Sequence, residues 1–433
     1  MDSFDRLAMS RLAHALALAL ALGIDSGAIH AGTVTTCIDD NSPTSLRSIV
    51  SGASNNEIID VSACNVIALT QGEVRVPVSI TLSNTKSYPT NIAGNGSGRV
   101  LHSITGAAGY RSLTLEHVNI GGGAINLYNA APALGGCILS GPLTLRHSSV
   151  NGCEVSSSGG ALGGAIHADS VIMEYSSAQG TARAQSTSDA AGGAIFSSGN
   201  VQCSYGMIRN SYATSYGGGG NGRGGGIYTV SGGVTLQGCS MDSNQARTGG
   251  AIYQAGTVGG VTLINSTISG NHAEGYGGVF SDGVATLKSS TIAFNYADNT
   301  CGGLYSKSAI VAQSTIVSNN SSGDPNCIDI HNPPGKPLTG ANNLFSVAPY
   351  ARSYPQDTII ADPKLSRLGL RGGWSLVHGL SVGSPAIDMG NNSAALGTDQ
   401  RGTGYARQYG PAPDIGAYER GLDDDEIFYG SFR

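Results

Sequence analysis

Charged and aromatic residues are scarce in this sequence of 433 residues. Asp, Glu, Lys and Arg make up 12% of it, and Phe, Trp and Tyr make up 6%, whereas glycine occurs 65 times. Scarce charge with abundant glycine can indicate disorder, but hydrophobic residues reach 40% and recur periodically, which argues against it. The formal net charge of −6 offers no basic surface to phosphate groups, so we expect no nucleic-acid partner.

Long helical patterns are also missing. No stretch in the regular part of the chain keeps apolar residues at helical spacing for the length of a ten-residue helix, and the patterns of leucine-rich and helix-pair solenoids are absent. Short β-prone stretches occur instead, such as VTLINSTI from Val261 and ATLKSSTI from Ala285. Apolar and polar residues alternate in them, which predicts strands with one face inward and one outward.

A Gly-Gly phrase recurs through this region. It is a glycine pair followed by small or apolar residues and usually an aromatic one, as in GGAIY. Copies begin at Gly163, Gly192, Gly224, Gly249, Gly277 and Gly302, and an earlier copy, GGCIL, begins at Gly135. The starts are 28, 29, 32, 25, 28 and 25 residues apart, and a period in this range predicts a solenoid.

A second phrase, apolar-x-x-Asn, lies between the copies of the first. Its copies end at Asn210, Asn244, Asn271, Asn295 and Asn319. We expect each asparagine to lie inward or in a turn and to bond the next coil, forming a ladder. The Gly-Gly pair fits a corner without room for Cβ, and the Ile-aromatic pair after it fits a core-filling strand. Together they predict an all-β parallel β-helix of about 25–30 residues per coil, with strands stacked about 4.8 Å apart.

The N-terminus has the pattern of a secretory signal peptide. Arg6 and Arg11 lie before and at the start of an apolar run, and small residues follow the run up to Gly32. Residues 1–31 therefore form the predicted signal peptide, with cleavage after Ala31. The run is too short for a comfortable transmembrane helix, and a buried N-terminal helix is the alternative. We therefore expect a secreted or bacterial cell-surface protein, without a transmembrane span once the signal is removed.

Eight cysteines follow the predicted signal: Cys37, Cys64, Cys137, Cys153, Cys203, Cys239, Cys301 and Cys327. An even number in an exported chain predicts disulfides, and zinc is disfavoured because no CxxC or CxxH spacing occurs. We expect pairing in sequential order. In that order the first pair ties down the N-terminal cap, and the third and fourth pairs join neighbouring coils.

The rest of the chain divides into segments that differ in composition and in whether the repeat is present. Residues 32–65 are the expected N-terminal cap, in which TSLRSIVSGA predicts a short amphipathic helix over the open end of the stack. Residues 66–345 are the expected β-helix. In residues 346–420 the repeat stops, which predicts a C-terminal cap with the single tryptophan, Trp374, packed in its core. Residues 421–433 are an acidic and aromatic tail, either a frayed end or a sorting signal.

The repeats resemble those of chlamydial polymorphic outer-membrane proteins, and the C-terminal part resembles the choice-of-anchor Q type of β-helix protein. The matching elements are Asp362-Pro363, Gly372-Gly373, His378, GSPAID from Gly383, TDQRG from Thr398 and DIGAYE from Asp414. The resemblance implies a right-handed parallel β-helix of the pectin-lyase-like fold and a location outside the cytoplasm. It implies little about activity, because this fold carries many functions.

We assign no catalytic, cofactor-binding or metal-binding residue from the sequence. The signatures of pectin-cleaving lyases and hydrolases (NTD, DD, GHG and RIK) are absent as a set, and carboxylates are sparse along the coils. Asp242 and Glu274 could approach each other on neighbouring coils, while His167 and His272 fit turn or surface positions better than catalytic ones. Calcium stays open, first at a carboxylate ladder on the coils and second in the cap.

Charged residues in the expected cap have two interpretations. They are Asp388, Asp399, Arg401, Asp414 and Glu419. The favoured one is a set of buried bonds that holds an irregular cap together, and the other is a metal or glycan site.

The sequence thus favours an exported, non-catalytic β-helix that serves as an adhesin-like or glycan-binding module. We expect it to be a monomer and its partner to be a polysaccharide or a cell-surface component. Tyr228 and Tyr253 could stack on sugars or pack within the protein. The alternative function is a polysaccharide lyase or glycoside hydrolase with a divergent site on the β-helix face, in which Asp242 or Glu274 would carry activity.

Overall fold

The computed structural model describes residues 30–421, apart from 104, 107–108, 130, 185–187, 217–219 and 350–352. The predicted signal peptide lies outside the described residues except for His30 and Ala31, which begin the first strand. The predicted tail lies outside them except for its first residue. None of the helices in the described part of the chain is long and apolar enough to cross a membrane.

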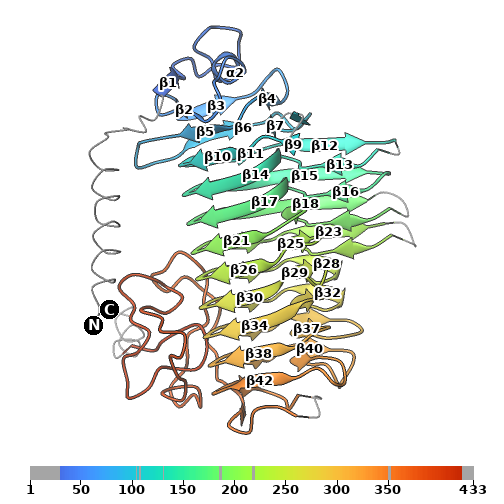
Figure 1. The fold of residues 1–433 in the computed structure, drawn as a ribbon, viewed down its shortest axis with the longest axis vertical. Coiled ribbons are helices and arrows are strands. Elements are labelled where there is room, and N and C mark those ends of the chain that lie inside the picture. Colours follow the sequence, from blue (N-terminus) through green and yellow to red (C-terminus); the bar gives the residue numbers. More distant parts are fainter. Residues whose placement is uncertain are drawn as a thin grey trace, which may run out of the picture.

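The chain folds into a right-handed parallel β-helix of about 11 turns, so the predicted fold class is confirmed (Figure 1). A typical coil contains four short strands, β29 (Ile252–Gln254), β30 (Gly260–Ile264), β31 (Thr267–Ser269) and β32 (His272–Gly275). The next coil begins with β33 (Val279–Ser281), which pairs in parallel with β29. Equivalent strands of successive coils therefore form four ladders, which we number I to IV in the order of one coil.

The ladders contain the following strands. Ladder I contains β4 (Val74–Val76), β7 (Leu101–Ser103), the first halves of β14 (Ile138–Arg146) and β17 (Ile166–Glu174), β20 (Ile195–Ser197), β25 (Ile227–Thr229), β29, β33, β37 (Leu304–Ser306) and β41 (Ile330–His331). Ladder II contains β1 (His30–Thr33), β2 (Glu57–Asp60), β5 (Ile80–Ser83), β10 (Leu113–Glu116), the second halves of β14 and β17, β21 (Val201–Ser204), β26 (Val234–Gln237), β30, β34 (Val284–Lys288), β38 (Ile310–Gln313) and β42 (Leu338–Ala341).

Ladder III contains β3 (Val66–Ala68), β6 (Thr90–Ala93), β11 (Val118–Gly121), the first halves of β15 (Ser149–Ser157) and β18 (Ser177–Ala184), β22 (Met207–Arg209), β27 (Ser240–Asp242), β31, β35 (Thr291–Ala293), β39 (Ile316–Ser318), β43 (Leu344–Phe345) and β44 (Ile359–Ile360). Ladder IV contains β12 (Ala124–Leu127), the second halves of β15 and β18, β23 (Tyr212–Ser215), β28 (Gln245–Thr248), β32, β36 (Tyr296–Ala297) and β40 (Ser321–Ser322).

Shorter pieces complete the strands. Beside ladder IV run β13 (Ala133–Leu134), β16 (Ala161–Leu162), β19 (Ala190–Ala191) and β24 (Gly222–Arg223). A small antiparallel pair, β8 (Thr105–Gly106) and β9 (Gly109–Tyr110), lies apart from the ladders.

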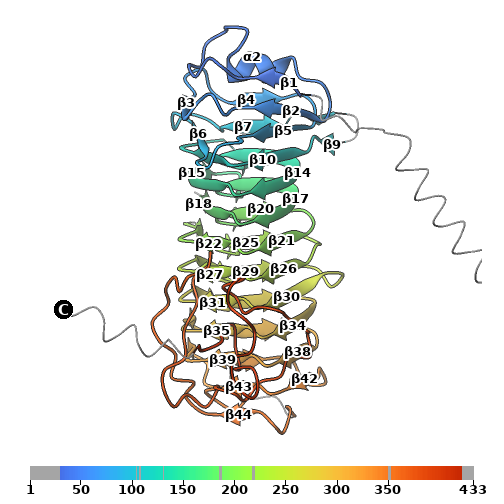
Figure 2. The same ribbon diagram turned by 90° about the vertical axis from the view of Figure 1, so that its left-hand side faces the viewer.

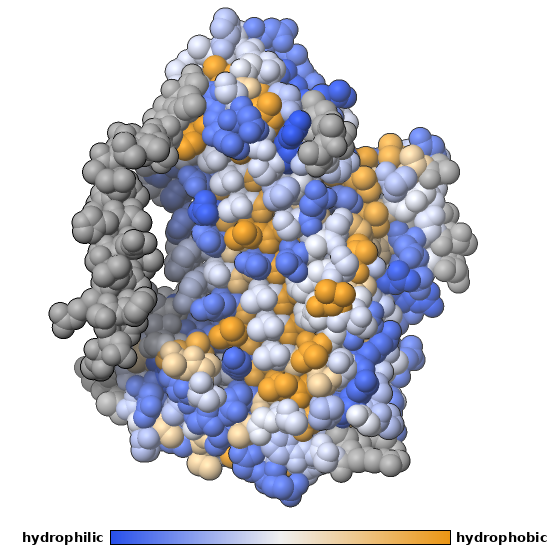
Figure 3. All heavy atoms as spheres, viewed as in Figure 1, coloured by the Kyte–Doolittle hydropathy of each residue, from blue (hydrophilic) through white to orange (hydrophobic). Residues whose placement is uncertain are grey.

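Inward side chains of ladders I, II and III fill a continuous core, and those of ladder IV form a smaller cluster made mostly of alanines. In one coil Ile252, Val261, Leu263 and Ile268 are each fully buried, and equivalent residues lie above and below them. This follows from the alternation seen in the sequence, because successive residues of a strand point to opposite faces. Outward positions are mixed, and Figure 3 shows apolar side chains scattered among polar ones over the visible face of the coils.

The five Gly-Gly pairs from Gly135 to Gly249 form the corners predicted for them, whereas in the pair at Gly277 the left-handed position belongs to the preceding Tyr276, with φ of 60°. Gly249 adopts a left-handed conformation with φ of 66°, and a Cβ on Gly250 would lie 2.2 Å from the carbonyl oxygen of Gly277 in the next coil. The first glycine supplies the turn and the second allows the coils to approach closely. The isoleucine that follows is buried in the core, whereas the aromatic residue after it lies on the outer side of ladder I. The expectation that both fill the core is therefore wrong for the aromatic residue.

An asparagine ladder crosses the coils at the turn from ladder III to ladder IV. The amide Nδ2 of Asn244 donates to Oδ1 of Asn271 at 2.9 Å, and Nδ2 of Asn271 donates to Oδ1 of Asn295 at 2.8 Å. Nδ2 of Asn295 donates in turn to Oδ1 of Asn320 at 2.9 Å, and the ladder ends on Asp329 at 3.0 Å. These buried amides join successive coils, as the sequence predicts for Asn244, Asn271 and Asn295.

The prediction is wrong by one residue at both ends of this series. Asn210 and Asn319 have φ of 48° and 55° and occupy the left-handed turn just before the ladder position. Ser211 and Asn320 hold the ladder position instead, and the backbone N–H of Ser211 donates to Oδ1 of Asn244 at 3.2 Å. Asparagine tolerates a left-handed backbone better than most residues, which explains its presence at both turns.

Four disulfides join the eight cysteines in the sequential order expected from the sequence. They link Cys37 to Cys64, Cys137 to Cys153, Cys203 to Cys239 and Cys301 to Cys327. The described part of the chain contains no free cysteine. The bridge between Cys137 and Cys153 spans 16 residues and closes a loop within one coil, whereas the other three join a coil or the cap to its neighbour. All four restrict the unfolded chain.

A short helix covers the N-terminal end of the stack, as predicted. It is α2 (Leu46–Ser51), whose N-cap residue Ser45 accepts a hydrogen bond from the backbone N–H of Ser48 (Figure 1). Leu46 and Val50 are buried beneath it and extend the core to this end. The apolar face of the helix thus covers strand edges that would otherwise be open.

The C-terminal part of the chain does not lie where the sequence analysis places it. Residues 361–420, which we call the C-terminal segment, run along the flank of the later coils instead of only closing their end (Figure 2). The expectation of a cap over residues 346–420 is therefore wrong for this segment. Its hydrogen bonds reach coils from Gly238 to Asn342, so it covers a side of the solenoid.

Candidate functional site

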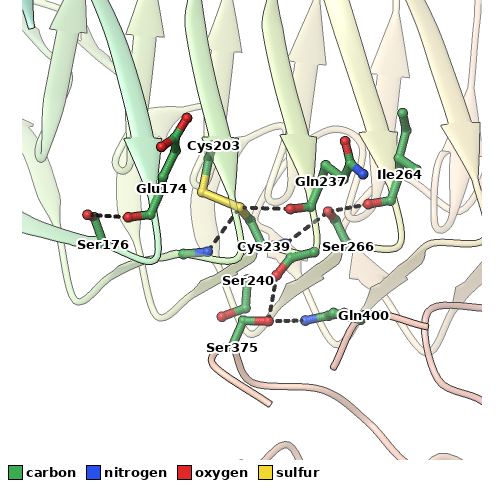
Figure 4. Close-up of a disulfide and its surroundings, with 12 residues drawn as sticks. Glu174, Ser176, Cys203, Gln237, Cys239, Ser240, Ile264, Ser266, Ser375 and Gln400 are labelled. Carbon is green, nitrogen blue, oxygen red and sulfur yellow. Dashed lines mark hydrogen bonds between the residues drawn. A yellow bond between two sulfur atoms is a disulfide. The ribbon is translucent and has the colours of Figure 1, made fainter. Parts of the chain in front are cut away.

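Polar contacts hold the C-terminal segment against the turns between ladders II and III. The hydroxyl of Ser375 donates to the carbonyl oxygen of Gly238 at 2.8 Å, and the backbone N–H of Leu376 donates to the Ser240 hydroxyl at 3.1 Å. Gln400 donates to Ser375 (Figure 4). Its side-chain oxygen accepts from the hydroxyl of Thr267. The disulfide between Cys203 and Cys239 lies next to these contacts and fixes two of the coils on which the segment rests.

Four aromatic rings form a column on the same turns. They are His117, His147, Tyr175 and Tyr205, each with a left-handed backbone between φ of 47° and 53°. Neighbouring rings are stacked with centroids 4.8, 5.0 and 5.1 Å apart. The column arises because the repeat places one ring at the same turn of successive coils. Stacking covers the faces of the inner rings and leaves their edges outward.

Trp374 projects from the C-terminal segment toward this column. Antiparallel bridges between Leu365 and Leu380 and between Gly369 and Val377 form the base of a loop that carries it. The indole meets the rings of His147 and Tyr175 edge to face, with centroids 5.8 and 5.5 Å away. Trp374 remains 55% exposed, so the prediction that it packs in a core is wrong.

Three rings of the column, His147, Tyr175 and Tyr205, bound a groove of about 160 Å³ together with Trp374, and we call it the aromatic groove. Most of its remaining lining is small or polar, and it consists of Asn119, Ser148, Ser149, Ser176, Ser177, Gly206 and the apolar Met207. Burial, and secondarily the neighbouring His117, lowers the pKa of His147, which favours a neutral imidazole in the column. The groove is therefore lined by a partly exposed indole, by ring edges and by hydroxyl groups, with no carboxylate among its lining residues.

A second cavity, of about 350 Å³, lies between β27, β31 and the C-terminal segment, and we call it the flank pocket. Asp242, Ser243, Ser269, Gly270, Phe294, Leu365, Ser366, Arg367, Leu368 and His378 line it. Asp242 is 3% exposed and accepts from Arg209 at 3.2 Å, while its Oδ1 is buried without a hydrogen-bond partner. Burial raises the pKa of this carboxyl, against the opposing effect of Arg209.

His378 connects the segment to ladder III in this pocket. Its Nδ1 lies 2.7 Å from the carbonyl oxygen of Ser366, and its Nε2 lies 2.8 Å from the hydroxyl of Ser269. A carbonyl oxygen can only accept, so Nδ1 carries the proton and Nε2 accepts from the serine. Burial lowers the pKa of His378 to about 4, which keeps it neutral near pH 7.

Among the predicted binding residues, only Asp242 lies in one of these two cavities. Its partner in the parallel register is Ser269, whereas Glu274 lies on ladder IV and pairs with Arg247 at 3.0 Å in an exposed position. The hypothesis that Asp242 and Glu274 approach each other is therefore wrong, because a turn separates their strands.

Tyr228 and Tyr253 belong to another column of stacked rings, on ladder I. The column runs through His167, Phe196, Tyr228, Tyr253, Phe280, Tyr305 and His331. Both tyrosines are half-buried, and burial raises the pKa of Tyr253. Of the two interpretations for these tyrosines, packing within the protein fits this arrangement.

The two histidines considered from the sequence differ in environment. His167 stacks on Phe196 and is largely buried, and burial lowers its pKa to about 4. His272 lies on the surface 3.3 Å from Asp298 and stacks on Tyr296. Neither lines the aromatic groove or the flank pocket.

The charged residues of the C-terminal segment hold it together. Asp399 pairs with Arg401 at 2.7 Å and accepts from the backbone N–H of Glu419, and the Arg401 guanidinium lies 4.0 Å from the ring centres of both Tyr405 and Tyr418. Asp414 accepts from the backbone N–H of Asp388, and Glu419 accepts from that of Asp414. These contacts match the structural interpretation. Throughout the described ranges, no three His, Cys, Asp or Glu side chains are grouped as metal ligands.

Comparisons with known proteins identify no family for this chain. No family model matches the chain. No curated protein matches it either. The chain is similar to the crystal structure of pectate lyase Pel9A, with a TM-score of 0.42 and 12% identity, over 92% of this chain and 98% of that one. On the register of its own strands, the chain is a disulfide-bonded parallel β-helix whose C-terminal segment forms two cavities with its flank.

Proposed function

We propose that the protein is an exported glycan-binding β-helix and that the aromatic groove contacts the sugar. The observation that carries this proposal is the exposed indole of Trp374, held edge to face against His147 and Tyr175. A pyranose ring presents C–H groups on its face, and an aromatic face attracts them while the sugar hydroxyls remain free to bond.

The surroundings of Trp374 support the same function. The faces of Tyr175 are covered by His147 and Tyr205, so this ring cannot stack on a sugar. The indole of Trp374 is then the ring that stacks on the sugar, and the edges of the column line one side of the groove. Ser149 and Ser177 line the groove within the same surface and can exchange hydrogen bonds with sugar hydroxyls. A polymer running along the solenoid would meet this surface over several coils.

Binding fits the cavities better than glycoside hydrolysis. Hydrolysis of a glycosidic bond ordinarily needs two carboxyl groups on opposite sides of the bond. The lining of the aromatic groove contains none, and that of the flank pocket contains only Asp242. The four disulfides fit export to an oxidising compartment, either the medium or the cell surface.

A binding panel tests this proposal. Residues 32–433, with disulfides intact, are applied to immobilised acidic and neutral polysaccharides, with and without calcium, together with the Trp374→Ala variant. We expect retention on at least one polymer and an affinity about tenfold or more lower for the variant, from a loss of about 1.4 kcal/mol. Tyr128→Ala is the matched control, because Tyr128 is 83% exposed outside the groove. Equal binding of Trp374→Ala and the parent, or no retention on any polymer, would overturn the proposal.

A further inference from the structure

The flank pocket contains a serine and a histidine arranged as a nucleophile and its base. Ser269 Oγ lies 2.8 Å from Nε2 of His378, within the range for a catalytic hydrogen bond. The carbonyl oxygen of Ser366, 2.7 Å from Nδ1, fixes the ring and its tautomer. A base that is itself oriented by a third group is the arrangement that activates a serine hydroxyl.

This pair differs from the other serine contacts of the C-terminal segment. Ser240 accepts from a backbone N–H of the segment, and Ser375 donates to a backbone carbonyl, so each satisfies a main-chain group. Ser269 instead directs its proton to a side-chain nitrogen, and both members of the pair line the cavity.

From this geometry we propose that the flank pocket hydrolyses esters of small carboxylic acids, with Ser269 as the nucleophile and His378 as the general base. This proposal is independent of the glycan function, because the two cavities share no lining residue. Phe294, Leu365 and Leu368 provide an apolar surface for the acyl group. A pocket of about 350 Å³ is at the small end of ligand sites, which suits a short acyl chain.

The reaction balances with water as its only co-reactant. Ser269 Oγ forms a bond to the ester carbonyl carbon while its proton passes to Nε2 of His378. The bond from that carbon to the alcohol oxygen then breaks, and the alcohol leaves with the proton from Nε2. Water repeats the sequence on the acyl-serine, releases the carboxylic acid and restores both side chains.

Charges in the pocket match those that develop in these steps. Asp242 lies beside Ser269 in the parallel register, and its carboxyl group lines the pocket in which the imidazolium forms. Arg367 lines the same cavity and supplies positive charge for the oxyanion. Burial lowers the pKa of His378 to about 4, which leaves Nε2 unprotonated near pH 7 but makes it a weak base. Because of this, and because no carboxylate of the described residues is hydrogen-bonded to His378, we expect slow turnover and a detectable acyl-serine.

The test labels the intact protein with a fluorophosphonate probe and maps the modified peptide by mass spectrometry. Release of 4-nitrophenol from 4-nitrophenyl acetate is measured in parallel for the parent, Ser269→Ala and His378→Gln. We expect the label on Ser269, no label on that peptide in Ser269→Ala, and a rate at least about 100-fold lower in both variants. Ser240→Ala is the matched control, because Ser240 contacts the segment outside the flank pocket.

Mapping the label on the parent protein does not depend on how the variants fold. A folded parent that leaves Ser269 unlabelled, or an ester hydrolysis rate unchanged in Ser269→Ala, would overturn the assignment. Polysaccharide binding is measured on the same samples with the parent and Trp374→Ala. Binding that depends on Trp374 while Ser269 stays unlabelled would rule out the esterase proposal and leave the glycan-binding proposal standing.

Discussion

The indole of Trp374 lies edge to face against the ring of Tyr175, with 5.5 Å between the ring centroids. Tyr175 belongs to a turn of the coil stack, whereas Trp374 belongs to the segment that returns along its flank. The contact therefore exists only when the segment is docked. It makes the aromatic groove a product of tertiary structure and not of the repeat alone.

Replacing Asn271 should weaken the fold far more than replacing Asn210. Asn271→Ala removes the acceptor for the backbone and side-chain N–H groups of Asn244 and the donor to Asn295, all of them buried. We expect a loss of about 2–4 kcal/mol in the free energy of unfolding. Asn210→Gly should change stability little, because glycine accepts the left-handed turn at φ of 48°.

Denaturant midpoints of the two variants check this register. A loss for Asn210→Gly as large as that for Asn271→Ala would mean that Asn210 also holds a ladder position, as first expected from the sequence.

Two glycines of the repeat region should differ sharply in their tolerance of alanine. A Cβ on Gly250 would lie 2.2 Å from the carbonyl oxygen of Gly277 and 2.6 Å from that of His272, so the coils would have to separate. We expect Gly250→Ala to lower stability by about 3 kcal/mol. Gly270→Ala meets open space and only the left-handed backbone at φ of 65°, which costs about 1 kcal/mol. Thermal melting of both variants measures the difference, and equal losses would contradict close packing at the corner.

Acid should destabilise the protein partly through His378. Burial lowers its pKa in the folded state to about 4, against 6.5 when unfolded. Between pH 4 and pH 6.5 the unfolded chain therefore binds more protons at His378 than the folded chain does. The contribution of this residue to the free energy of unfolding, present in full above pH 6.5, is lost as the pH falls toward 4. Integration from pH 7 to pH 5 gives a loss of about 2 kcal/mol from this group.

The matching experiment compares unfolding of the parent and His378→Gln at pH 7 and pH 5. The variant should lose about 2 kcal/mol less than the parent between the two values, whatever its stability at pH 7. His167→Gln is a second comparison, since the pKa of His167 is also lowered to about 4. Identical pH dependence of parent and His378→Gln would show that His378 does not titrate as a buried group.

The repeat made the fold predictable, because its period, its corner glycines and its alternating strands all favour one architecture. The asparagine register was harder. Ile316 and Val317 are adjacent apolar residues, so apolar-x-x-Asn fits that coil in two alignments, ending at Asn319 or at Asn320. In the coil of Met207 and Ile208 the phrase fits only from Met207 to Asn210, because the count from Ile208 ends at Ser211. Only the inward residue of each pair, Ile208 or Val317, starts the correct count, and the structure identifies it by its place in the register.

The two cavities were not visible in the sequence as sites. Ser269 and His378 lie 109 positions apart, and the segment that brings them together has no periodicity to show where it docks. One signal was available: His117, His147, Tyr175 and Tyr205 recur at about the spacing of the Gly-Gly phrase. Rings at that period predict a column, but only the docked segment adds Trp374 to it.

Trp374 is the only tryptophan in the chain, so its fluorescence reports on the aromatic groove directly. Titration of the protein with the polysaccharide that it retains most strongly is the most direct test of glycan binding at this groove. Glycan binding at Trp374 should give a saturable shift of the emission to shorter wavelength, because a sugar on the indole displaces water from it. Retention of the polysaccharide with no change in Trp374 emission would place binding elsewhere and rule out the aromatic groove as the site.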